Sequence, residues 1–148
     1  GRPGLAVAAF AVGPVGVAVR EVAVGGLWCA TNVVQAQTGA ILPIGLDHVP
    51  LLGTTLADIA QEKAGIIHEC AFVVLAAQEP EAAAVLLERA ASVGATVARE
   101  GLEFSVMDRR PAVGGQLLTL QGLAGVYEDL FVPLHGPHQA QNALVALA

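Results

Sequence analysis

The sequence predicts an α/β domain in which a mostly parallel sheet is flanked by helices. Hydrophobic residues make up 55% of the 148 residues but aromatic residues only 4%. The interior must therefore be built from Ala, Val and Leu, which suits buried parallel strands covered by Ala-rich helices. Short apolar runs alternate with helical patterns over the first two thirds of the chain, as in successive βα units. The length fits one domain with a single core.

The first fifteen residues predict the end of a helix, over residues 5–10, and a turn at Gly13-Pro14. The apolar run over residues 15–22 then predicts a buried strand with Glu21 at its carboxyl end.

A glycine-containing loop over residues 23–31 separates this run from a second apolar strand, expected over residues 40–46. That strand ends at Asp47-His48. An acidic residue and an imidazole therefore follow the second strand, as Glu21 ends the first.

The next element is a helix with recognisable ends. Thr55 and Asp58 have the spacing of a capping box, with Asp in place of the usual Glu. The helix is expected to run to Ala64 and to stop at Gly65, which places Lys63 in its last turn.

A second βα unit follows directly. Residues 71–76 predict a strand, Pro80 begins a helix that runs to Val93, and Gly94 closes it. The pattern then changes to alternating stretches over 103–107, 116–120 and 126–132, which predict a small antiparallel ribbon.

The last residues return to helical spacing over residues 138–148. A His-Gly-Pro-His turn precedes them, and Gly136 and Pro137 make that turn sharp. The sequence therefore predicts a final helix next to the ribbon.

Composition excludes two classes of partner. With seven basic and thirteen acidic residues the net charge is -6, which repels a nucleic-acid backbone. The uncharged run between Arg2 and Arg20 is broken by glycine and proline and is too short for a membrane-spanning helix. Cys29 and Cys70 follow no metal-ligand spacing and are too few for a disulfide scaffold, which favours a reduced, cytoplasmic setting.

Glu21 and His48 are both expected at the carboxyl ends of strands, where ligands collect in open α/β sheets. A carboxylate and a neutral imidazole can share a divalent cation, and Mg2+ typically takes only one or two protein groups. The pattern alone favours solvated loop side chains for both. It equally favours a simple helix-end cation, complementing the helix dipole, for Lys63.

Four blocks of residues occur in an order and spacing typical of one family. They are Glu21-Val-Ala-Val-Gly-Gly-Leu-Trp-Cys-Ala-Thr-Asn32, Leu46-Asp-His48 with Leu52-Gly53, Glu62-Lys-Ala-Gly-Ile-Ile67, and His138-Gln-Ala-Gln-Asn-Ala143. In these blocks, and over residues 15–148, the sequence resembles folylpolyglutamate and dihydrofolate synthases, the folate branch of the Mur ligase superfamily. The resemblance implies the central, P-loop-type domain of that superfamily.

The resemblance also implies roles for individual residues. Glu21 and His48 correspond to Mg2+ ligands, and Lys63 to a lysine that is carbamylated in the family. Because a carbamate forms only on an unprotonated amine, we expect Lys63 to be partly desolvated. Asn142 corresponds to an asparagine that contacts the adenine of ATP. The loop residues that align with pterin-contacting positions are Trp28, Cys29 and Ala30.

The implied activity is that of an ADP-forming amide ligase. ATP phosphorylates a carboxylate of folate or dihydropteroate, and the amino group of L-glutamate attacks the acyl phosphate, with Mg2+ as an electrostatic clamp. We expect these three substrates as partners, no nucleic acid or membrane partner, a cytoplasmic location and a monomer at full length.

Departures from the family pattern are equally specific. Ala23 replaces a glycine, Leu27 an arginine and Cys29 an aspartate, and no Gly-x-x-Gly-Lys-Ser/Thr phosphate loop occurs in the sequence. We therefore expect residues 1–148 to be a partial Mur-ligase-like central ATPase domain, truncated at both ends. We expect this piece to lack the phosphate loop and the carboxyl-terminal glutamate ligase domain, and we expect no catalysis by it alone.

Two alternatives stay open at this point. One is the muramyl peptide ligase branch, which the Asp47-His48 block, the Glu62-to-Ile67 block and Gln139 disfavour. The other is a degenerate, non-catalytic relative kept as a binding module, which Leu27, Cys29 and the missing phosphate loop favour.

Overall fold

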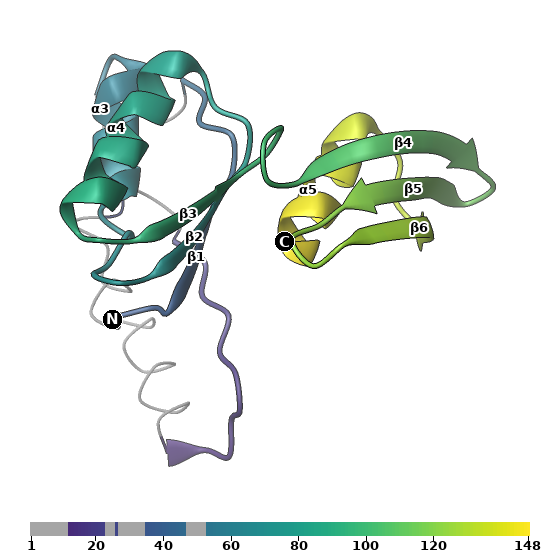
Figure 1. Ribbon diagram of the computed structural model, residues 1–148, viewed down its shortest axis with the longest axis horizontal. Coiled ribbons are helices and arrows are strands. Elements are labelled where there is room, and N and C mark those ends of the chain that lie inside the picture. Colours follow the sequence, from purple (N-terminus) through teal and green to yellow (C-terminus); the bar gives the residue numbers. More distant parts are fainter. Residues whose placement is uncertain (1–11, 23–25, 27–34, 47–52) are drawn as a thin grey trace.

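Two small sheets carry the fold of the chain (Figure 1). The computed structural model describes residues 12–22, 26, 35–46 and 53–148. A parallel sheet has the order β1-β2-β3, and an antiparallel sheet has the order β4-β5-β6. The elements are β1 Thr38–Ile41, α3 Leu56–Ala64, β2 Phe72–Leu75, α4 Pro80–Ser92, β3 Thr96–Arg99, β4 Ser105–Ala112, β5 Gly115–Gln121, β6 Val126–Val132 and α5 Pro137–Leu147.

The parallel sheet and its two helices confirm the predicted βα units. Helices α3 and α4 pack against each other and lie on one side of the sheet (Figure 1). Small residues on the inner faces of both helices allow this close packing. The first hydrophobic cluster consists of Ile41, Ile44, Ile59, Ala60, Ala64, Ile67, Ala71, Val73, Leu75, Ala82, Leu86 and Ala90.

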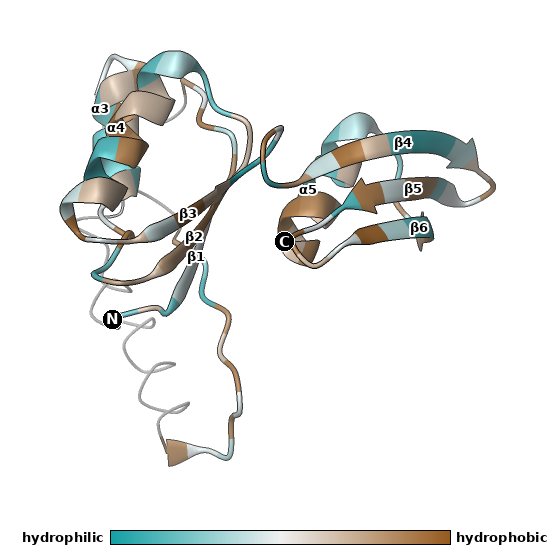
Figure 2. Ribbon diagram, in the orientation of Figure 1, coloured by the Kyte–Doolittle hydropathy of each residue, from teal (hydrophilic) through white to brown (hydrophobic). Residues whose placement is uncertain are grey.

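The antiparallel sheet and α5 form the other half, as the alternating pattern and the final helical spacing predicted. Helix α5 packs against β4, and Figure 2 shows that the outer half of β4 is hydrophilic while β5 is largely apolar. The second cluster consists of Val74, Ala76, Ala98, Phe104, Leu118, Leu120, Ala140, Leu144 and Val145.

The expectation of a single core is wrong, because strand β2 contributes to two. Val73 and Leu75 of β2 belong to the first cluster, and Val74, with Ala76 directly after the strand, to the second. Successive side chains of a strand point to opposite faces, so the fully apolar β2 sequence satisfies both clusters.

The strand predicted over residues 15–22 is also wrong. The segment lies outside any helix or strand, and Val17 and Val19 are 84% and 92% exposed. Strand formation needs a neighbouring strand to satisfy the backbone N–H and C=O groups, and residues 15–22 belong to neither described sheet. Glu21 is therefore an exposed residue of an irregular segment rather than a strand end.

Two further strands differ from expectation. The strand expected over 40–46 begins at Thr38 and ends at Ile41, because Pro43 lacks the N–H that would continue the ladder. Strand β3 was not expected at all, since only the short run of residues 95–98 separates Gly94 from the change of pattern. It pairs in parallel with β2.

Candidate functional site

Lys63 lies in the last turn of α3 and is partly buried. The desolvation expected of its amine stays a prediction. The helix places Ile59, Ala60 and Ala64 in the first cluster, which fixes the rotation of α3 about its axis. The backbone of Lys63 is therefore held by the core, while its side chain stands at the boundary between core and solvent.

The start of α3 is fixed by the predicted capping box. The Asp58 N–H donates to Thr55 Oγ1 at 3.1 Å, and the Thr55 N–H donates to Asp58 Oδ2 at 3.1 Å. The Thr54 N–H donates to the same carboxylate at 3.2 Å. Hydrogen bonding from the side chain and backbone of Thr55 lowers the pKa of Asp58, because these donors favour the ionised form.

Gly26 lies against the other end of the same helix. It is buried, and a Cβ on it would overlap the carbonyl oxygen of Glu62 and lie 3.2 Å from the Cα of Lys63. Only glycine permits so close an approach of two backbones. The loop that follows Glu21 in sequence therefore touches the backbone of Lys63.

A second point of proximity precedes Glu21. Burial lowers the pKa of His68, and the positive charges of Arg20 and Arg89 lower it further. Arg20 therefore lies within electrostatic reach of the loop that follows α3. Arg20 and Gly26 flank Glu21 in sequence, so one residue on each side of Glu21 lies near α3 or the loop that follows it.

The approach to Asp47-His48 is tethered by a residue that the sequence did not single out. The Gln78 amide donates to the Leu42 carbonyl at 3.0 Å, and its carbonyl oxygen accepts from the Ile44 N–H at 3.0 Å. Gln78 thus substitutes for a strand partner on both sides of Pro43. Its local sequence context gives no signal of this, because the contact spans more than thirty residues.

Several predicted site residues lie outside the described part of the chain. They are His48, Trp28, Cys29 and Ala30, together with the family departures Ala23 and Leu27. Among the described residues no group of three or more His, Cys, Asp or Glu side chains is placed to hold a metal ion. No helix in this same portion is both long and apolar enough to span a membrane.

Asn142 is exposed on α5, and its Nδ2 donates to Gln139 Oε1 at 3.4 Å. Helix α5 belongs to the second cluster, whereas the Lys63 helix belongs to the first. Asn142 and Lys63 are therefore positioned by different cores, which strand β2 connects.

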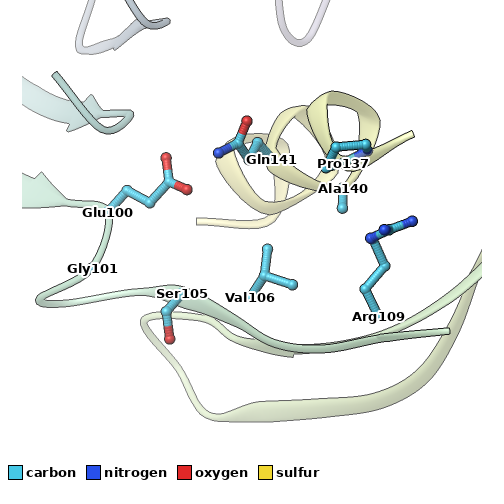
Figure 3. Close-up of a pocket in the computed structure, with 8 residues that line it drawn as sticks. All are labelled: Glu100, Gly101, Ser105, Val106, Arg109, Pro137, Ala140 and Gln141. Atoms are coloured by element: carbon cyan, nitrogen blue, oxygen red, sulfur yellow. The ribbon is translucent and has the colours of Figure 1, made fainter. Parts of the chain in front are cut away.

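A shallow pocket of about 290 Å³ lies between α5, β4 and the β3–β4 connection (Figure 3). Val106 and Arg109 of β4 point toward α5 in this view, with Glu100 at the opposite wall. Asn142 does not line it. The α5 residues at its rim are Pro137, Ala140 and Gln141.

Comparison with curated proteins finds relatives along nearly the whole chain. The chain is 52% identical over 150 aligned residues to the dihydrofolate synthase/folylpolyglutamate synthase of Mycobacterium tuberculosis, covering 97% of the chain and 31% of that protein. It is 38% identical over 133 residues to the folylpolyglutamate synthase of Lacticaseibacillus casei, covering 90% and 31%. No family model matches the chain.

Solved structures agree with these relatives. The M. tuberculosis folylpolyglutamate synthase complexed with ADP superposes with a TM-score of 0.93 at 52% identity, covering 99% of the chain and 34% of that structure. An FPGS–AMPPCP–folate complex superposes with a TM-score of 0.95 at 37% identity, covering 98% and 35%. The chain spans about a third of the length of these relatives.

Proposed function

Because the chain belongs to the folylpolyglutamate synthase/dihydrofolate synthase family of Mur ligases, we propose that it forms part of an ATP-dependent, ADP-forming ligase that adds L-glutamate to folate or dihydropteroate. Nucleotide and folate complexes of matching structures support this proposal. ATP is the co-substrate in this proposal, and the γ-phosphoryl group is transferred to a substrate carboxylate.

The observation that carries the proposal is the contact between Gly26 and the last turn of α3. It supports a common site for the block that contains Gly26 and the block that contains Lys63, which are far apart in sequence.

We assign Lys63 the role of a carbamylated lysine. The ammonium group first loses a proton to solvent. The neutral amine then attacks the carbon of carbon dioxide, a C–N bond forms as one C=O bond opens to C–O−, and the nitrogen loses a second proton to solvent, which leaves an anionic carbamate. The position of Lys63 in the last turn of α3, at the edge of the core, supports this assignment.

Glu21 and His48 are the proposed ligands for Mg2+. The exposed carboxylate of Glu21 has the hard oxygen donors that Mg2+ prefers, and the Gly26 contact keeps its segment near Lys63. When bound, the ion neutralises charge on the phosphoryl oxygens. His48 supplies the second protein ligand in this proposal.

The reaction then needs two substrate steps. A substrate carboxylate oxygen attacks the γ-phosphorus of ATP, which releases ADP and leaves an acyl phosphate; the glutamate nitrogen attacks the acyl carbon, and phosphate and a proton leave. In this scheme Asn142 binds the adenine, and the substrate's pterin is held by Trp28, Cys29 and Ala30.

We place residues 1–148 in the central ATPase domain of such a ligase. Phosphoryl transfer also requires a phosphate loop and a glutamate-binding domain, so we propose that catalysis depends on both in addition to this chain. The second candidate is a non-catalytic relative, and Leu27 and Cys29, at positions where the family has arginine and aspartate, favour it.

The gene provides the first test. An open reading frame that continues upstream into a Gly-Lys-Ser/Thr loop and downstream into a second α/β domain supports the ligase. Stop codons close to both ends of the coding segment support the non-catalytic alternative.

The complete polypeptide provides the second test, through folate-dependent release of ADP. We expect Glu21→Gln and Lys63→Met each to lower turnover on the order of 100-fold, as for loss of an electrostatic group at a reacting centre. Glu128→Gln removes an exposed carboxylate on β6 and serves as the control that keeps activity. Equal turnover in all four proteins would rule out the assigned roles.

A further inference from the structure

Strand β5 presents an amide to the core where an apolar residue would be expected. Gln116, Leu118 and Leu120 alternate along the strand and are 1%, 0% and 1% exposed, so all three share the inward face. Gln116 is the one buried polar or charged residue in the portion of the chain that the structure describes. Burying an amide is costly unless its hydrogen bonds are satisfied.

The hydrogen bonds of Gln116 converge on the turn before α5. Its Nε2 donates to the carbonyl oxygens of Leu134 at 2.9 Å and Gly136 at 3.1 Å. Its Oε1 accepts from Arg109 Nη1 at 3.4 Å. A primary amide is suited to two carbonyls because it carries two donor hydrogens on one nitrogen.

The neighbouring glycine holds the same turn from the backbone side. A Cβ on Gly115 would overlap the carbonyl oxygen of Val132 and lie 2.9 Å from the Cα of Pro133. The start of β5 therefore contacts residues 132–136 in two ways: Gly115 makes a close backbone contact, and the Gln116 side chain donates two hydrogen bonds.

These contacts matter for helix α5 because no side chain caps its amino end. Its N-cap is Gly136, with φ of 99°, and no side chain caps the first turn. Gln116 accordingly fixes the direction in which the chain enters α5, and that helix carries Asn142. Arg109, the third partner, also lines the pocket beside α5 (Figure 3).

We infer that Gln116 is a positioning residue for nucleotide binding, acting through the 134–136 turn on the placement of α5 and Asn142. The inference rests on the proposed function for its catalytic consequence. The physical coupling of Gln116 to α5 does not depend on it.

Amide hydrogen exchange on the 148-residue chain tests the coupling directly. We expect Gln116→Leu to speed exchange at residues 139–142 about tenfold, because the Leu134 and Gly136 carbonyls lose a partly buried donor. Gln116→Glu keeps the size of the side chain but replaces the donor nitrogen with an oxygen and adds a negative charge. It loses the same two hydrogen bonds, so it should speed the same amides and provides a second test if the leucine variant does not fold. Gln121→Leu is the matched control, since that amide lies on the same strand and donates only to the adjacent Gly122 carbonyl, at 2.9 Å.

The consequence for nucleotide binding is tested in the complete polypeptide by titration with ADP. We expect both Gln116 variants to raise the Kd for ADP about tenfold, with the KM for folate unchanged and Gln121→Leu like the wild type. Unchanged exchange and unchanged Kd would overturn the inference. A wild type that binds no ADP would instead defeat the proposed function, while exchange still decides the role of Gln116.

Discussion

Gly26 lies so close to the Glu62 carbonyl that no side chain fits between them. The contact joins a loop from the first sequence block to the last turn of a helix from the third. Lys63 follows Glu62 directly, so any movement of residue 26 is transmitted to the backbone that carries the lysine.

Replacement of Gly26 by alanine tests that link. The added methyl group must displace the helix end or the loop, and we expect a loss of about 1–3 kcal/mol in the free energy of unfolding, as for overpacking. Chemical denaturation measures it. The control is Gly39→Ala, because a Cβ on Gly39 meets nothing within 4 Å. Equal stability of the two variants would show that the Gly26 contact is not rigid.

Gln78 offers a test of the tether on residues 42–44. We expect Gln78→Leu to lower the free energy of unfolding by about 1–3 kcal/mol, because the Ile44 N–H and the Leu42 carbonyl lose their hydrogen-bond partner. Pro43, which lies between them, has no N–H to donate. Thermal unfolding and exchange of the Ile44 amide measure the loss. Gln141→Leu is the comparison, as Gln141 is exposed on α5, and a similar loss there would contradict the assignment.

The capping box predicts a pH dependence. The pKa of Asp58 is lowered in the folded protein from its usual 3.8, so the ionised carboxylate stabilises the fold above that value. The contribution is lost as the pH falls through the lower, folded pKa. Unfolding free energies measured from pH 7 to pH 2 should show this acid-side loss in the wild type.

Asp58→Asn provides the matching variant, because an amide cannot ionise but keeps the size of the side chain. We expect it to be less stable than the wild type at pH 7 and to approach it at pH 2. Glu88→Gln, on the exposed face of α4, should leave the wild-type profile intact. Parallel profiles for wild type and Asp58→Asn would refute the capping contribution.

Local signals account for the parts of the fold that the sequence predicted. The Thr55–Asp58 spacing and Pro80 mark helix starts by backbone chemistry that a few neighbouring residues decide. The alternating runs after residue 102 likewise predict strands from period alone. The run over 15–22 gives a wrong prediction because local composition is its only evidence. Its residues suit a strand, but a strand forms only where a neighbouring strand can pair with it.

In the candidate site, too, features decided by neighbouring residues could be predicted, and contacts between distant residues could not. Lys63 could be placed at a helix end from its own surroundings, whereas the role of Glu21 came only through family resemblance. The contacts of Gly26, Gln78 and Gln116 all join residues distant in sequence, and no window of neighbours encodes them. The assignments of His48, Trp28, Cys29 and Ala30 stay predictions.

Strand β2 has a consequence for how the molecule comes apart. Alternate side chains along the strand pack into opposite hydrophobic clusters. Unfolding of either half therefore exposes one apolar face of the strand to water. Unfolding should accordingly be all-or-none across both sheets. A protease cut on either side of β2 would yield no autonomous fragment, because each piece would expose the apolar face that the other had covered.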